Sequence, residues 1–545
     1  MSFNKKLINF QELSLTEKVF FFYTIILSFT IILQFVFIPF SYNSLHIEDT
    51  FLLAESAWRV FNGGIPGVDF EHYFGGISSS LIAQSFKIWG VSIKSIDYAF
   101  LIQYLIVIVM LYIATYKRVS LISGITVFFV LTGVMLTRIP YEEYSSLIVI
   151  ESAHSFSYNR FGMALMFVMM IFALFTTHTK KIDYFVAVIM GGAAFLLIFT
   201  KTTFFIFFIG FILVLLIKKR GIELLLVSIL LIALSLAYSM PVERLWNTFN
   251  YAKIANNVDG AYWWLLMKPL RIFWSQAWAF MIVISSIIYL YLNITKELIS
   301  VLISVVIFFI VMMIVAMTMG AEGMTGHHVL PMLAVIMICL FEIDKRINNS
   351  ESLIFKTLIA VMVIPIISLH IALSTLANLK GLHNKDAVYF SKGPLKGYLA
   401  SGSRATFDTT KINMVDNAAR YLEMGGVVNI DTHYAGLADA YSYFSQIEST
   451  NLRLGSDSPL GFSFSMMTEP VMDYLIWPRE GALLEKQYDA IPIDIDVMLM
   501  SLYPGSNVSA ILLPLVNQDF QLCNKTKLWN VYVRKDKELT MYCYY

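Results

Sequence analysis

Long runs of apolar residues recur along the first two thirds of the chain, separated by short polar segments. A transmembrane helix needs about 20 residues to cross roughly 30 Å of hydrocarbon. Runs that approach this length, some only with neighbouring residues, lie at 19–40, 98–116, 119–137, 161–177, 184–200, 204–217, 224–240, 272–292, 298–319, 329–341 and 353–376. The pattern predicts an α-helical polytopic membrane protein with about eleven transmembrane helices.

Residues 75–89 are ambiguous, because they are only marginally hydrophobic and include Gln84 and Lys87. Counting them as a span would put the basic clusters at 117–118, 180–181 and 218–220 outside, against the preference of Lys and Arg for the cytoplasmic side. Omitting them returns all three clusters to the cytoplasm. We therefore interpret residues 75–89 as a juxtamembrane helix in the first external loop, with the N-terminus cytoplasmic and the C-terminus outside.

The first external loop, residues 41–97, opens with a short amphipathic helix pattern that begins at Glu48 and Asp49 and stops at a Gly-Gly pair. An acidic residue at a helix start can simply cap the helix, whereas a carboxylate near a bilayer usually has a partner or a function. A second acidic pair, Asp69 and Glu71, follows at the far end of the loop and is adjacent to His72. Two acidic clusters that frame one loop favour a site for an acceptor or a cation.

Two cations stand at the external ends of apolar runs. Lys201 lies at the tip of a predicted helical hairpin, and Arg160 immediately precedes the run at 161–177. Either cation could anchor the chain at the lipid interface. Either could instead bind a phosphate, for which the planar guanidinium of Arg is well suited.

His327 and His328 precede the predicted span at 329–341. Because adjacent residues point to different faces of a helix, a metal site built from both is disfavoured. Interfacial hydrogen bonding and contact with phosphate or sugar are the alternatives.

Residues 377–545 differ in character, since their hydrophobic runs are short and Gly, Asp, Asn and Ser are frequent. They predict one external soluble domain of α/β or α+β class. Within it we expect a helix at 413–424, buried strands at 427–430 and 508–516, and a hairpin of 529–533 with 539–545. Cys523 and Cys543 would form a disulfide in an oxidising compartment, and free thiols are the alternative.

Composition narrows the class of protein. A hydrophobic content of 58%, a charged content of 14% and a mean hydropathy of +0.69 exclude a soluble globular protein. The formal net charge of +1 says little about partners, because the placement of Lys and Arg matters more in a membrane protein. No basic patch predicts binding of nucleic acid.

The order of motifs over residues 15–220 resembles the N-terminal region of GT-C-fold, polyprenyl-phosphate-dependent membrane glycosyltransferases of the bacterial ArnT/PMT-like kind. In that family an acidic pair opens the first juxtamembrane helix, a Gly-Gly turn closes it, and Asp-Phe follows. Counting back from Gly63 puts Asp49 at the position of the family's catalytic Asp. Thr50 replaces the usual second acid, and Phe74-Gly75-Gly76 stands in place of a Pro-Pro.

Further polar positions are similar to loop positions of the same family. These are Tyr158-Asn159-Arg160 at the start of a span and Phe199-Thr200-Lys201 at a turn. The resemblance implies a GT-C-like transmembrane catalytic domain at residues 1–376. The substrate-binding candidates are Glu48, Asp69, Glu71, His72, Tyr158, Asn159, Arg160, Lys201, His327 and His328.

The resemblance implies an inverting glycosyltransferase in the cell inner membrane. Asp49 would be the general base, and the donor would be a polyprenyl-phosphate sugar. The acceptor would be a glycan such as a cell-envelope polysaccharide, a lipid or a protein. We expect a monophosphate donor and no cofactor. Whether the reaction needs a divalent metal depends on whether the donor is a monophosphate or a diphosphate. The alternatives are a flippase or transporter and a polymerase of lipid-linked saccharides.

Overall fold

The computed structural model describes most of the residues between 40 and 348 and parts of the chain beyond them. The described ranges are 40–42, 47–70, 75–136, 140–141, 149–150, 157–177, 179–255, 277–293, 298–318, 329–348, 388–389, 398–400, 453–456, 495–501, 507–525 and 529–536, with single positions at 22, 25, 28, 29, 33, 274, 355, 357, 358 and 543.

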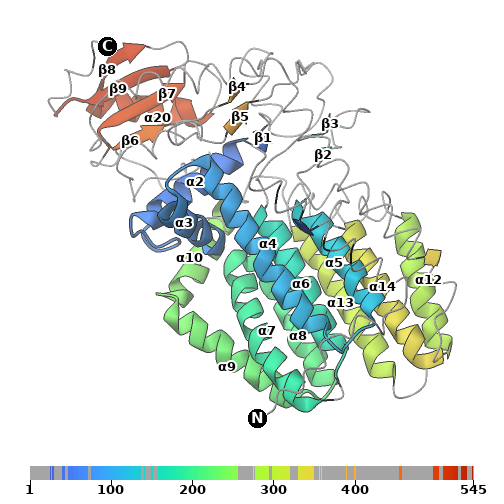
Figure 1. Ribbon diagram of the computed structural model, residues 1–545. Helices are drawn as coiled ribbons and strands as arrows, with labels where there is room; N and C mark the ends of the chain where they lie inside the picture. Colours follow the sequence, from blue (N-terminus) through green and yellow to red (C-terminus); the bar gives the residue numbers. More distant parts are fainter. Residues whose placement is uncertain are drawn as a thin grey trace.

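Apolar helices form a bundle (Figure 1). They are α4 (Ile93–Thr115), α5 (Leu121–Leu136), α6 (Ser157–Leu174), α7 (Lys180–Thr200), α8 (Phe205–Ile217), α9 (Gly221–Ala237), α12 (Ala277–Asn293), α13 (Ile299–Thr318) and α14 (Val329–Asn348). Every predicted span between residues 98 and 341 coincides with one of these helices. The predicted spans 19–40 and 353–376 lie almost entirely outside the described residues.

Length and apolar composition qualify only some of these helices as membrane spans in their own right. Among the described residues these are α4, α6, α7 and the Ile299–Ala316 part of α13. A fifth is obtained if α9 and the first part of α10 (Pro241–Ala255), which follows it across a sharp bend, count as one broken span. The membrane-spanning class is therefore supported, and the number eleven stays a prediction.

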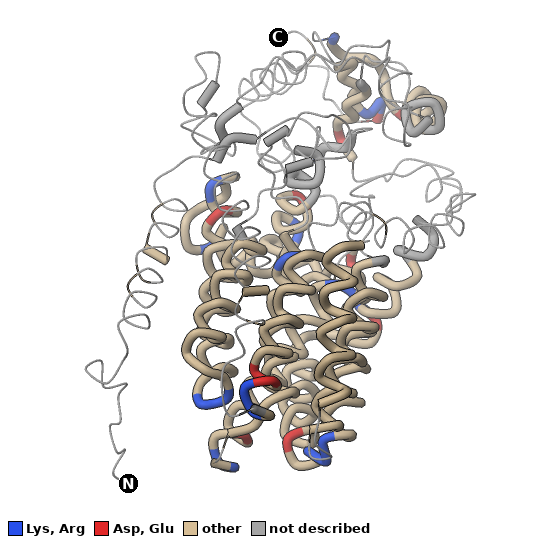
Figure 2. The backbone as a smooth tube through the Cα atoms, turned by 90° about the vertical axis from the view of Figure 1, so that its right-hand side faces the viewer, with Lys and Arg blue, Asp and Glu red and all other residues tan. Residues whose placement is uncertain are grey.

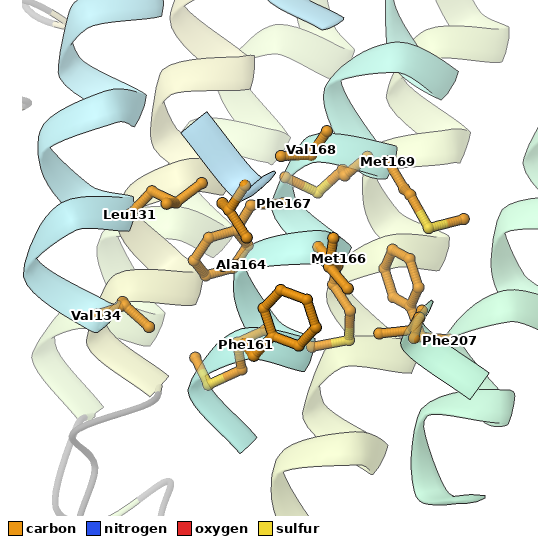
Figure 3. Close-up of a cluster of buried hydrophobic side chains, with 14 of the residues drawn as sticks. Leu131, Val134, Phe161, Ala164, Met166, Phe167, Val168, Met169 and Phe207 are labelled. Carbon is orange, nitrogen blue, oxygen red and sulfur yellow. The ribbon is translucent and has the colours of Figure 1, made fainter. Parts of the chain in front are cut away.

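Helix α6 lies at the centre of the bundle. All of its residues are buried, and it contacts α4, α5, α7 and α8. Figure 3 shows Phe161, Ala164, Met166, Phe167, Val168 and Met169 of α6 between Leu131 and Val134 of α5 and Phe207 of α8. A helix that is apolar on every side must be surrounded by other helices, because it has no polar face to present to water.

The basic clusters gather at one end of the bundle, where Figure 2 shows Lys and Arg at the lower helix ends. Arg118 forms an ion pair with Asp183 at 2.5 Å, and the Arg346 guanidinium donates to the Arg118 carbonyl at 2.8 Å. Burial lowers the pKa of Lys218 to about 8, and the nearby Arg220 and Arg346 add to the shift. The three predicted clusters and the pair Lys345-Arg346 at the end of α14 thus share one end, as the predicted alternation of spans requires.

The described C-terminal residues contain a four-stranded sheet of order β6-β7-β9-β8. Its strands are β6 (Leu454–Ser456), β7 (Val497–Ser501), β8 (Phe520–Lys525) and β9 (Trp529–Arg534), and only β6 and β7 pair in parallel. The predicted strand at 529–533 is confirmed as β9. Its hairpin partner is β8, and the predicted partner 539–545 lies outside the described residues apart from Cys543.

The predicted strand at 508–516 is wrong, because helix α20 (Asn507–Asp519) covers it. A short apolar run does not distinguish a buried strand from a buried helix. Leu512 and Val516 are the buried positions of α20 among its described side chains, and their spacing of four is that of a helix face. The predicted helix at 413–424 and strand at 427–430 lie outside the described residues, and Cys523 and Cys543 are joined by a disulfide.

Three short pairings connect loops at the other end of the bundle. Strand β1 (Phe40–Tyr42), just before the first loop helix, pairs in parallel with β5 (Tyr398–Ala400), which pairs with β4 (Val388–Tyr389). Strands β2 (Pro140–Tyr141) and β3 (Val149–Ile150) form an antiparallel pair. The residues beyond 377 are thus hydrogen-bonded to the segment that leads into the Glu48-Asp49 helix.

We predict that Asp183→Asn destabilises the bundle, because it leaves the buried Arg118 without its ion-pair partner. Breaking a buried pair costs about 3–5 kcal/mol, so the thermal unfolding temperature in detergent should fall clearly. Glu243→Gln, at an exposed position, is the control and should unfold at the temperature of the unchanged protein. Equal unfolding temperatures for the two variants would contradict the structural role of the pair.

Candidate functional site

Two helices occupy the loop of residues 41–97, at the end of the bundle opposite the basic clusters (Figure 1). Helix α2 (Ile47–Phe61) ends where the sequence predicted, since Gly63 with a φ of 98° closes it. Helix α3 (Ile77–Trp89) has 13 residues, which at 1.5 Å each reach about 20 Å. That length is too short for a span, as the interpretation of residues 75–89 expected.

Glu48 and Asp49 lie in the first turn of α2, as the sequence pattern predicted. Their side chains are outside the described part of the structure, so the catalytic role of Asp49 stays a proposal. Glu71, His72, His327 and His328 also fall outside the described residues.

Asp69 closes a tight turn between the two loop helices. Its carboxylate accepts a hydrogen bond from the Ile65 backbone N–H at 2.7 Å, and its own N–H donates to the Ile65 carbonyl at 2.9 Å. The side chain is otherwise exposed. The geometry therefore gives Asp69 a local structural role and leaves its side chain exposed.

The structure brings together Lys201, Asn159 and Tyr158, which belong to two separate helix ends. The Lys201 Nζ donates to the Asn159 Oδ1 at 3.1 Å and lies 5.3 Å from the centre of the Tyr158 ring. The chain leaves α7 at Thr200 and re-enters the bundle through the 3-10 turn η3 (Thr202–Phe204). The Lys201 cation is thus directed toward the start of α6, whereas an interfacial anchor would extend toward lipid.

Positive charge accumulates at the N-terminus of α6. Arg160 is buried in its first turn, one residue after Asn159, and Lys201 is only partly exposed. The N-terminal end of a helix also carries partial positive charge from its backbone N–H groups. The N-terminus of a helix is a common binding site for anions in proteins.

Gly75 joins the first loop to the Lys201 turn. Its N–H donates to the Thr200 carbonyl at 3.0 Å, and a Cβ added at Gly75 would lie 2.1 Å from the Phe199 carbonyl oxygen. Only glycine permits this approach of two backbones. Gly75, at a position that departs from the family pattern, therefore packs the start of α3 against the end of α7.

An ion pair that the sequence analysis missed lies inside this loop. Arg59 binds Glu55 at 3.1 Å within α2, and both side chains are buried. The Arg59 guanidinium also lies 5.4 Å from the centre of the Phe70 ring. Burial raises the pKa of Glu55, and Arg59 opposes the shift. The spacing of four residues was visible in the sequence, but burial of the pair was not.

A second missed residue is Arg244 of α10. Its guanidinium lies 3.9 Å from the centre of the Tyr238 ring, and its Nε donates to the Ser239 carbonyl at 2.6 Å. Burial lowers the pKa of Arg244, while Tyr238 and Asp69 oppose the shift. Pro241 and Glu243 in the first helical turn are a start signal that could have revealed α10 within the loop 241–271.

Within the described ranges, no three His, Cys, Asp or Glu side chains lie close enough together to hold a metal ion.

We predict that Gly75→Ala is destabilising, because the added methyl group would collide with the end of α7. Overpacking of this kind costs about 1–3 kcal/mol. Gly133→Ala is a matched control, since nothing lies within 4 Å of a Cβ at that position in α5. Thermal unfolding in detergent should show a lower midpoint for Gly75→Ala only. A midpoint for Gly75→Ala at or above that of the unchanged protein would contradict the close approach.

No protein-family model matches the chain, and no curated protein matches it. Among solved structures, the chain is similar to the Archaeoglobus fulgidus oligosaccharyltransferase in complex with Zn and sulfate, at 11% identity, 91% coverage of this chain, 71% coverage of that chain and a TM-score of 0.47.

It is also similar to ArnT from Cupriavidus metallidurans in the apo state, at 11% identity, 95% and 98% coverage and a TM-score of 0.44. The same ArnT bound to undecaprenyl phosphate matches at 12% identity, 94% and 97% coverage and a TM-score of 0.40.

Proposed function

We propose that the chain is an inverting glycosyltransferase that moves a sugar from a polyprenyl-phosphate donor to a glycan, lipid or protein acceptor at the external face of the inner membrane. The observation that carries the proposal is the grouping of Lys201, Asn159 and Tyr158 at the N-terminus of α6. That group lies where the first loop packs against the bundle, since Gly75 bonds to Thr200, the residue before Lys201.

The positive end of α6 supplies the charge that a phosphate leaving group requires. Lys201 and Arg160 would take the phosphate of the donor, and the backbone dipole of α6 would add to their field. As the bond from the anomeric carbon to the phosphate oxygen breaks, its electron pair moves onto the phosphate. Groups that are already oriented toward this charge stabilise the transition state without further reorganisation.

Asp49 would act as the general base. The acceptor hydroxyl gives its proton to the Asp49 carboxylate while its oxygen attacks the anomeric carbon from the side opposite the phosphate. One displacement inverts the configuration at that carbon. Glu48 would tune the neighbouring carboxylate, and Asp69, Glu71 and His72 would line the acceptor side of the loop. His327 and His328 would be further contacts for phosphate or sugar.

The distribution of charge supports a transferase over a flippase. A path for a charged headgroup through the membrane needs polar groups near the middle of the spans. Between Arg160 and the C-terminal end of α6, at the centre of the bundle, every residue is uncharged and buried. Arg160 and Lys201, the two cations proposed to bind the phosphate, are both at the external end of the bundle.

Replacing Asp49 with Asn should abolish transfer while the protein still folds, because the amide has no basic oxygen for the proton. Mass spectrometry of the glycans and lipids in cells that carry only the variant measures the effect. Loss of the chain's product together with an unchanged unfolding temperature is expected. Glu243→Gln is the matched control and should restore the product in full. Full transfer activity in the Asp49→Asn variant would contradict the assignment of Asp49 as the general base.

Lys201→Met should lower kcat by about 100-fold or more, the usual effect of removing one group that stabilises developing charge. Lys201→Arg should retain part of the activity because it keeps the positive charge. Lys180→Met, at an exposed lysine on the opposite end of the bundle, is the control and should leave kcat unchanged. A kcat for Lys201→Met equal to that of the control would show that Lys201 is only an anchor.

Mass measurement of the glycans and lipids in cells that lack the protein distinguishes a transferase from a flippase. Cells that lack a transferase should contain acceptor molecules that are short by one sugar. Cells that lack a flippase should contain the complete lipid-linked sugar on the wrong side of the membrane. Loss of chain length would instead indicate a polymerase.

A further inference from the structure

Helix α10 lies across the external end of the bundle. It follows α9 after a bend of 85°, so the chain turns from the direction of a span to a direction nearly perpendicular to it (Figure 1). The bend is at Tyr238–Met240, and Met240 has a φ of 53°. Pro241 then opens α10, since its fixed φ suits the first position of a helix.

One face of α10 is apolar and exposed. Val242, Trp246 and Phe249 are 78%, 63% and 54% exposed, and their spacing of four and three residues places them on one side of the helix. The outer side of α9 is also apolar and exposed, at Leu225, Ile229, Ile232 and Leu236. In a membrane span such a stripe faces lipid, so the lipid-facing surface of α9 continues onto α10.

The opposite face of α10 is polar and holds the Asp69 turn. The Asn247 Nδ2 donates to the Gly67 carbonyl at 2.8 Å. A Cβ at Gly67, whose φ is 79°, would lie 3.0 Å from the Arg244 carbonyl oxygen and 3.2 Å from the Thr248 hydroxyl. The turn therefore packs closely on α10 and follows it wherever the helix is placed.

We infer that α10 lies in the plane of the outer membrane interface, with its Val242-Trp246-Phe249 face in the lipid, and that it thereby sets the height of the Asp69 turn above the bilayer. An amphipathic helix with Trp and Phe on its apolar face is typical of that interface. The consequence for catalysis rests on the proposed function, since the sugar of a lipid-phosphate donor lies at headgroup level.

The position of α10 can be measured without any enzymatic activity. Spin labels are placed on the full-length protein at Val242→Cys, Phe249→Cys and, as control, Glu243→Cys, in vesicles of phosphatidylethanolamine and phosphatidylglycerol. The native thiols do not interfere, because Cys523 and Cys543 are paired and Cys339 is buried. Collision rates with oxygen, which enters the bilayer, and with a water-soluble nickel chelate report the depth of each label.

At Val242 and Phe249 the label should collide with oxygen and be protected from the nickel chelate, while the label at Glu243 should meet the chelate. Collision of the chelate with all three labels would place α10 in water and overturn the inference. Exclusion of both reagents from Val242 and Phe249 would also overturn it, because that result indicates cover by protein, such as a second copy of the chain.

The coupling of α10 to the Asp69 turn has its own test. Trp246→Glu should slow transfer from a long-chain donor in vesicles by about tenfold or more, because a misplacement of about 1 Å can cost 100-fold in rate. Trp246→Tyr, which keeps an interfacial aromatic ring, should retain the rate. With a short, water-soluble prenyl-phosphate donor in detergent, Trp246→Glu should match the unchanged protein. An unchanged rate for Trp246→Glu in vesicles would overturn the coupling.

Discussion

Basic side chains contact both ends of the buried helix α6. At its C-terminus, Arg220 donates to the Phe172 carbonyl at 2.6 Å and Lys218 donates to the Leu174 carbonyl at 2.7 Å. These contacts satisfy the last backbone carbonyls and the negative end of the helix dipole. At the N-terminus, Lys201 donates to the Asn159 side chain, and this is the positive end of the helix dipole, which suits an anionic ligand. The central helix thus has a structural end and a candidate functional end.

The first loop reaches the functional end through backbone contacts that tolerate no side chain. Gly75 lies against Phe199 and Thr200, and Gly67 lies against Arg244 and Thr248. Between these two contacts the chain carries Asp69, and before them runs α2 with Glu48 and Asp49 in its first turn. A loop fixed at two points can hold a carboxylate near the cations of α6, which catalysis by the proposed mechanism requires.

Hydrophobic pattern predicted the bundle helices and the two loop helices well, because length and periodicity depend only on residues that are near in sequence. The same reasoning failed at residues 508–516, because a short apolar run does not distinguish a buried strand from a buried helix. The hydrophobic pattern also did not reveal α10, because the polar segment 241–271 between two predicted spans was interpreted as a loop along its whole length. The hairpin partner of β9 was misassigned, since pairing joins residues that no local pattern relates.

By itself the sequence determined the membrane class, the bundle helices between residues 98 and 341, the shared end of the basic clusters and the loop that carries Asp49. Each of these follows from the local cost of placing polar or charged groups in hydrocarbon. Tertiary structure alone decided that Lys201 meets Asn159 and Tyr158, that Glu55 and Arg59 are buried together, and that α10 supports the Asp69 turn. Those contacts join segments through packing, and packing depends on the shape of the whole bundle.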